Sequence, residues 1–301
     1  MVSFGILAMV LVGLSWTFYG YVMGKAPRQN IQVSCLMPVC SLVTALAGLT
    51  IGLAQGVPQV ERRVFLLTLV SCWSAGFLNF FQLELMSCAM QRGPNGIIWS
   101  IVQSGFVFPF FMGVIWFHVP LTMIRLLGVS SLVVSLALVG FCKGGQATGK
   151  WRLFALGSFV FTGTLQMLSN LPSYFPQAEA VTSPWRYMAS ASGMLLGGVV
   201  CGVVGNRNYG CKVLEHVRRL SFWKMVLTLT VPSSFASVFF LYPGMNILAQ
   251  AGIGSVAYPI MVASCIIGFE VFALLFLHEK RNLLQILALL LCLVGVVGIC
   301  L

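Results

Sequence analysis

The sequence predicts an all-α membrane protein with ten transmembrane helices, arranged as two inverted five-helix repeats. Three observations carry this prediction. The 301 residues are 59% hydrophobic and only 8% charged, whereas soluble domains carry roughly 25% charged residues. Ten apolar stretches are long enough to cross a bilayer. The second half of the chain also repeats, in order, several features of the first half.

Each expected helix is an apolar run that ends where charged or polar residues begin. A helix needs about 20 apolar residues to cross the hydrocarbon core. Lipid requires backbone polar groups to bond within the chain, which favours helices. The expected spans are 2–24, 32–55, 64–90, 96–117, 124–142, 151–171, 184–205, 222–248, 254–277 and 283–301. The first is too long for the apolar part of a signal peptide, so we expect it to remain as a helix.

The duplication divides the chain into residues 1–150 and 151–301. Matching features lie 150 positions apart at first, and 160 positions apart after the longer connection 206–221. The matched positions are Gly48 with Gly198, Gly52 with Gly202, Phe80 with Phe240 and His118 with His278. Because each unit has an odd number of helices, the second must enter the membrane from the opposite side. Inverted repeats of this kind are typical of secondary transporters.

The basic residues predict how the chain is oriented. Thirteen of the 17 Lys and Arg residues fall in the connections after the first, third, fifth, seventh and ninth spans. The other side holds only Arg62, Arg63, Arg125 and Arg186. The positive-inside rule places the richer side in the cytoplasm and both termini outside. We expect a multi-pass protein of a bacterial inner (plasma) membrane, as a monomer or a homodimer.

Composition argues against several other classes of protein. The formal net charge is +11, but the basic residues lie between apolar runs and form no module for nucleic acid. The sequence contains no Asp, and its ten Cys are scattered without a CxxC pair, so no metal or hydrolytic cluster is visible. No phosphate-binding loop occurs. We therefore expect no enzyme activity and no cofactor.

Two acidic residues lie inside expected spans and are candidates for proton coupling. Glu84 precedes Arg92 by eight residues, and Glu270 precedes His278 by eight. Both carboxyl groups would lie roughly 12 Å inside the same membrane side. Buried carboxyl groups are costly in hydrocarbon and are often functional, and burial favours a pKa suited to carrying protons. The alternative is a side chain that reaches the interface or pairs with a basic residue.

A set of amides and aromatic residues in the spans predicts a binding site for a small polar molecule. Amides would donate and accept hydrogen bonds, and rings would stack on the ligand. The same residue types also bridge helices or form interfacial belts, and that reading stays open for each. The candidate substrate-binding residues are Trp16, Tyr19, Asn79, Gln82, Gln103, Gln166, Asn170, Tyr242, Asn246 and Tyr258.

Glycines and prolines predict close packing and kinks. Small residues at four-residue spacing, as in Gly48 and Gly52, let helices approach closely, either within one chain or across a dimer. Prolines inside spans remove a backbone donor and bend helices. The prolines concerned are Pro109, Pro232, Pro243 and Pro259.

The ends of the two repeats resemble the drug/metabolite transporter superfamily of the EamA type. The second repeat ends in LFLHEKRNLLQILALLLCLVGVVG (275–298), an apolar helix, Glu279, a basic turn and a last helix punctuated by glycine. The first repeat departs from this pattern with Val119 at the Glu position, but keeps Gly128. Residues 76–115 are loosely similar to the L-rhamnose–proton symporter group. The positions that match are Gly76, Asn79, Gly93, Gly96 and Pro109.

The resemblance implies a substrate cavity between the repeats that opens to one side at a time. It also implies cytoplasmic termini, in conflict with the charge count. Together with the residues above, it favours a secondary transporter of a small polar metabolite, with sugars among the candidates and protons as the coupling ion. The alternatives are an exporter of drugs or amino acids, and a membrane sensor or assembly subunit that transports nothing.

Overall fold

A computed structural model describes residues 2–118, 122–141, 150–205, 208–276 and 283–300. Within this part the chain forms helices and short connections and contains no strand. The α-helices are α1 (Val2–Lys25), α2 (Val33–Gln55), α3 (Arg62–Met90), α4 (Asn95–Gln103), α5 (Val107–Trp116), α6 (Met123–Phe141), α7 (Lys150–Asn170), α8 (Ser183–Gly205), α9 (Tyr209–Val217), α10 (Leu220–Ala236), α11 (Tyr242–Gln250), α12 (Ala257–Phe276) and α13 (Leu283–Cys300). The prediction of an all-helical protein is therefore confirmed for the described residues.

Seven helical segments in this part of the chain are long and apolar enough to cross a membrane. They are α1, α2, α3, α8, α12, and the continuous segments Asn95–Trp116 and Leu220–Gln250. The outer surface is apolar as well. Val204 is 83% exposed, and Leu153 is 72% exposed. A soluble protein rarely exposes so much contiguous apolar surface, so these features are compatible with a multi-pass integral membrane protein.

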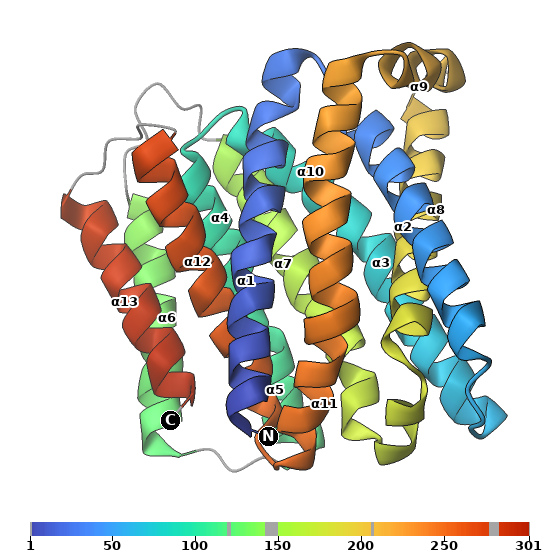
Figure 1. The fold of residues 1–301 in the computed structure, drawn as a ribbon. Helices are drawn as coiled ribbons and strands as arrows, with labels where there is room; N and C mark the ends of the chain where they lie inside the picture. The colour runs from blue at the N-terminus through green and yellow to red at the C-terminus, as the bar shows by residue number, and fades with distance from the viewer. Residues whose placement is uncertain (1, 119–121, 142–149, 206–207, 277–282, 301) are drawn as a thin grey trace.

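The long helices run roughly along one axis and form a bundle (Figure 1). Helix α3 packs against α7 and α8, α2 packs against α8, α1 against α12, and α6 against α13. Helix α1 begins and α13 ends at the same end of the bundle (Figure 1), which we call the termini end. At the opposite end, the far end, the short helix α9 crosses between α8 and α10 (Figure 1).

Glycines allow the closest helix contacts, and these contacts lie within one chain. A Cβ atom on Gly76 of α3 would lie 1.8 Å from the carbonyl oxygen of Ser190 on α8. A Cβ atom on Gly48 of α2 would lie 3.1 Å from Met188 on α8. Since Gly48 was a candidate for packing within the chain or across a dimer, the structure assigns it to intramolecular packing.

Two long segments are interrupted near predicted kinks. A 3₁₀ turn, η2 (Ser104–Phe106), joins α4 to α5 shortly before Pro109. A π-helical segment, η5 (Ser237–Leu241), joins α10 to α11 and lies between Pro232 and Pro243. Each proline removes a backbone donor and forces its ring on the preceding turn, so local departures from α-helical geometry are expected there.

Candidate functional site

A cavity lies in the middle of the bundle and is lined by residues from both halves of the chain. Its volume is about 120 Å³, well above the ~10–15 Å³ that one water needs. Its wall contains side chains from α1, α2, α3, α4, α7, α8, α10, α11, α12 and the π-helical segment. No acidic or basic residue is among the described residues of this wall.

Eight of the ten candidate substrate-binding residues lie in the wall of this cavity. They come from six helices, so the fold collects positions that are far apart in sequence. These eight are Trp16, Tyr19, Asn79, Gln82, Gln103, Gln166, Tyr242 and Tyr258. Asn170 is buried at the end of α7 and lies outside the wall. Asn246 lies in a different cavity, described below.

Two buried amide oxygens in the wall have no hydrogen-bond partner among the described residues. They are Oε1 of Gln103 and Oε1 of Gln166, and these side chains are 5% and 1% exposed. In contrast, Nε2 of Gln82 donates to Oγ of Ser158 at 3.1 Å. Buried polar groups are nearly always bonded, so the two free acceptors are suited to a ligand that brings hydrogen-bond donors.

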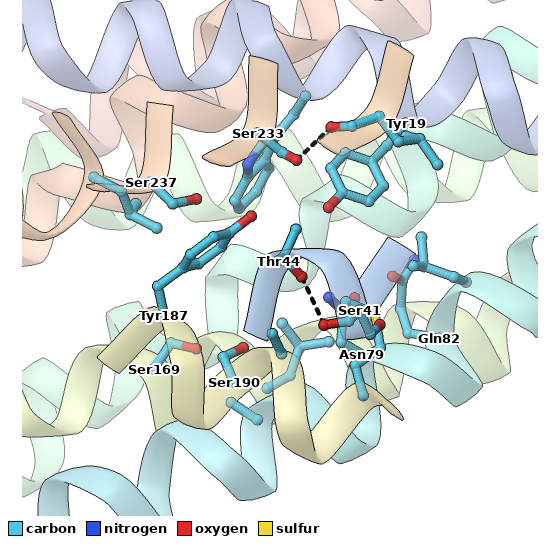
Figure 2. Close-up of a pocket in the computed structure, with 18 of the residues that line it drawn as sticks. Tyr19, Ser41, Thr44, Asn79, Gln82, Ser169, Tyr187, Ser190, Ser233 and Ser237 are labelled. Atoms are coloured by element: carbon cyan, nitrogen blue, oxygen red, sulfur yellow. Dashed lines mark hydrogen bonds between the residues drawn. The ribbon is translucent and has the colours of Figure 1, made fainter. Parts of the chain in front are cut away.

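Small hydroxyl residues form a further part of the wall that the sequence did not single out. Figure 2 shows hydroxyl groups of Ser41, Thr44 and Tyr187 directed toward the same space. The hydroxyl of Ser41 donates to the carbonyl of Met37 at 2.7 Å. Ser and Thr in helices commonly bond the preceding turn in this way, which leaves their oxygen lone pairs for a ligand. In the sequence these residues look like ordinary helix residues.

The two candidate proton-coupling residues lie outside the cavity wall. Glu84 is partly buried on α3, with the thiols of Cys35 on α2 and Cys201 on α8 as electrostatic neighbours. Glu270 is 8% exposed on α12 and lies near the thiol of Cys292 on α13. Each carboxyl group is six residues before the end of its helix at the far end. Neither can touch a ligand in the cavity in this conformation.

Arg186 is a buried basic residue at the start of the expected span 184–205, which the charge count placed on the side with fewer basic residues. It lies in the first turn of α8 with 0% exposure. Its Nη2 donates to the carbonyl of Ala178 at 2.5 Å, and its Nε donates to the carbonyl of Val181 at 3.0 Å. Its Nη1 donates to Oδ1 of Asn246 at 3.3 Å. No carboxylate within the described residues lies within 4.0 Å of it.

The guanidinium of Arg186 lies directly behind the cavity wall. Its central carbon is 5.7 Å from the centre of the Tyr242 ring, and Tyr242 lines the cavity. The exposed carboxylate of Glu179 is an electrostatic neighbour of Arg186, but it accepts a hydrogen bond from Gln250 at 2.5 Å. A buried positive charge therefore acts on a cavity that has no acidic side chain of its own.

A second cavity, of about 410 Å³, lies toward the termini end. Its wall includes Asn246, Gln250 and Glu179. The rings of Phe117 and Tyr174, which also line it, stack with centres 3.9 Å apart. The bond between Arg186 and Asn246 lies between this cavity and the central one, since Asn246 lines the second cavity and Tyr242 the first.

Comparison with known proteins shows the fold alone. No protein-family model matches the chain, and no curated protein matches it by sequence. Among the solved structures, one described only as "Crystal structure of protein" superimposes with a TM-score of 0.58. It covers 98% of this chain and 96% of its own, at 13% sequence identity. The chain therefore has, over nearly its full length, a fold similar to one already known.

Proposed function

We propose that this protein is a secondary active transporter of a small polar metabolite that works by alternating access. The observation that carries the proposal is the central cavity. It lies inside an apolar bundle, it is lined by amides, hydroxyls and rings from both halves of the chain, and two of its buried amide acceptors have no partner among the described residues. Buried polar groups inside a membrane protein commonly mark a substrate pathway.

The proposal includes ten membrane spans in two inverted repeats. Helices α6, α7 and α13 have 19, 21 and 18 residues, and at 1.5 Å per residue each is about as long as the hydrocarbon core is thick. The packing is also compatible with a repeat. Helix α1 packs against α12 and the α10–α11 segment, and its counterpart α7 packs against the α4–α5 segment and α3.

The chemistry of the cavity favours a neutral or anionic substrate with several hydroxyl groups. Hydroxyl groups would donate to Oε1 of Gln103 and Gln166, and the rings of Trp16 and Tyr19 offer stacking surfaces. The charge of Arg186 opposes a cation. At an effective dielectric constant of about 20, two unit charges about 8 Å apart interact by roughly 2 kcal/mol. Cationic drugs are therefore the less favoured substrates.

Protons are the proposed coupling ion, with Glu270 and Glu84 as the proposed carriers. Since neither carboxyl group lines the cavity, a change of protonation would act on helix packing. Glu270 would change the contact between α12 and α13, and Glu84 the contact of α3 with its neighbours. The resemblance of the repeat ends to the drug/metabolite transporter superfamily is compatible with this mechanism, as is a bacterial inner membrane location.

Uptake into proteoliposomes tests the proposal. Neutral hexoses and deoxyhexoses, with the matching uronic acids and amino sugars, would be compared with and without a pH gradient. We expect saturable uptake of a neutral or acidic compound. Gln103→Leu together with Gln166→Leu should weaken binding of that compound by about tenfold, because each loses an acceptor. Gln55→Leu, at an exposed position, is the matched control.

Three outcomes would count against the proposal. Uptake that is limited to organic cations would favour an exporter of drugs. Equal effects of the cavity variants and of Gln55→Leu would remove the cavity as the binding site. Folded protein that neither binds nor moves any compound of the panel would favour a sensor or an assembly subunit.

A further inference from the structure

A third cavity, of about 510 Å³, lies at the far end between the last turns of α1 and α12. It is separate from the central cavity and shares no lining residue with it. Two basic residues, Lys25 and Arg28, and two aromatic residues, Phe272 and Phe276, contribute to its wall. No acidic residue is among the described residues that line it.

Glycines on α1 shape this cavity. A Cβ atom on Gly20 would lie 2.5 Å from the ring of Phe269, so that position is tightly packed. One turn later, a Cβ atom on Gly24 would meet Asn95 only at 3.5 Å. Because Gly24 carries no side chain, the space between the helix ends stays open to a ligand. Both glycines line the cavity.

The two basic groups are placed at the rim of the cavity. The ammonium group of Lys25 donates a hydrogen bond to the hydroxyl of Tyr21 and lies 4.7 Å from the centre of that ring. Arg28 is exposed in η1 (Pro27–Gln29), immediately after α1. Two cations in one cavity wall attract a phosphate group.

The aromatic residues form the apolar side of the same cavity. The rings of Phe272 and Phe276 stack with centres 5.0 Å apart, and Tyr21 meets Phe272 edge-on at 5.2 Å. Phe276 is 68% exposed, and Leu275 beside it is 63% exposed. These side chains continue the apolar outer surface of α12. The cavity therefore joins a cationic rim to a surface suited to hydrocarbon.

We propose that this cavity binds the headgroup of an anionic phospholipid. The phosphate would lie between Lys25 and Arg28, and an acyl chain would run along Phe272 and Phe276. Basic cavities between helix ends are known to suit such headgroups. A free phosphate ion would use the rim but gain nothing from the rings, so the combination favours a lipid. The proposal is independent of whether the protein transports a metabolite.

Native mass spectrometry of the purified protein with phosphatidylglycerol or phosphatidylcholine tests the site. We expect the wild type to retain phosphatidylglycerol in preference to phosphatidylcholine. Lys25→Gln together with Arg28→Gln should weaken that retention by roughly 30-fold, because the loss of each basic residue should weaken it by roughly fivefold. Arg62→Gln together with Arg63→Gln is the matched control, since both residues are exposed at the opposite end.

Further measurements separate the lipid from a free anion. Phe276→Ala should reduce retention of phosphatidylglycerol without changing binding of inorganic phosphate. Arg28→Gln alone, at an exposed position, serves if the double variant does not fold. The proposal is wrong if the Arg62 and Arg63 variants lose as much lipid, if phosphatidylcholine is retained equally, or if inorganic phosphate displaces the lipid at similar concentrations.

Discussion

At the scale of single residues, Arg186 is a fully buried charged group that is held by hydrogen bonds. Three of its N–H groups are held by two backbone carbonyls and the amide of Asn246. A fully buried guanidinium is costly unless such bonds satisfy it. The bonds tie the start of α8 to α11 and to η4 (Pro176–Ala180). The residue therefore both stabilises the termini end and sets the charge behind Tyr242.

Replacing Arg186 separates these two roles. Arg186→Met would leave the two carbonyls and the amide without a donor, and we expect a loss of about 2–4 kcal/mol in the free energy of unfolding. Thermal unfolding in detergent measures this loss. Arg63→Met, at an exposed position, should change stability little. A variant as stable as the wild type would show that water replaces the guanidinium without cost.

The fraction of the Arg186→Met variant that folds should also bind cationic compounds in the central cavity more tightly than the wild type does. Removal of the charge behind Tyr242 should weaken the preference for an acidic over a basic version of the same compound. At roughly 2 kcal/mol of attraction for the acid and of repulsion for the base, the ratio of affinities should fall by up to roughly 1,000-fold. Competition binding with a uronic acid and an amino sugar measures the ratio. An unchanged ratio would exclude Arg186 as the source of charge selectivity.

At the scale of secondary-structure elements, the closest helix interfaces depend on glycine, which has no side chain. Gly76→Ala would place a methyl group within 1.8 Å of the Ser190 carbonyl, and α3 would have to move away from α8. Overpacking of this kind costs about 1–3 kcal/mol. Gly205→Ala, where nothing lies within 4 Å of the added atom, is the control. Equal unfolding temperatures for the two variants would contradict the tight α3–α8 contact.

We expect the docking of helix α9 to depend on pH. His216 stacks on Phe222 with ring centres 6.0 Å apart, and burial, aided by the charge of Arg219, lowers the pKa of His216. The folded state thus favours the neutral ring. The stabilisation is complete above the ordinary pKa of about 6.5 and is lost as the pH falls below that value toward the lowered pKa.

We therefore expect the backbone amides of α9 to exchange hydrogen faster, relative to the intrinsic rate, at pH 5.5 than at pH 7.5. His216→Phe keeps a stacked ring and removes the titrating group. The dependence on pH should then disappear while protection at pH 7.5 remains. A persistent dependence in His216→Phe would assign the effect to another group.

At the scale of the whole molecule, the proposed proton coupling requires that two distant carboxyl groups influence one cavity. Glu270→Gln should abolish most of the accumulation driven by a pH gradient while leaving exchange of substrate across the membrane in place, because exchange needs no net proton movement. Uptake and counterflow in the same proteoliposomes measure both. Unchanged gradient-driven uptake would remove Glu270 from the coupling mechanism, and the same comparison applies to Glu84→Gln.

Much of the fold could be predicted because lipid restricts the possible structures. The expected span 32–55 corresponds to α2 at Val33–Gln55, and 184–205 to α8 at Ser183–Gly205. The amides and rings of the cavity were visible because polar groups are rare in apolar helices. Ser41 and Thr44 were not visible, since hydroxyls satisfy themselves on their own helix. The burial of Arg186 was hidden because it depends on η4 and α11, which no local pattern places beside it.

The π-helical segment Ser237–Leu241 has a mechanical consequence. A π-turn contains more residues than an α-turn and interrupts the regular α-helix, so we expect this segment to bend more easily than the helices on either side. Ser237 and Leu241 both line the central cavity, which places this joint at the level of that cavity. Twisting at this joint would let α11 swing away at the termini end while α10 stays anchored at the far end. One half of a helix, and not a whole repeat, would then be the smallest moving part that opens the cavity.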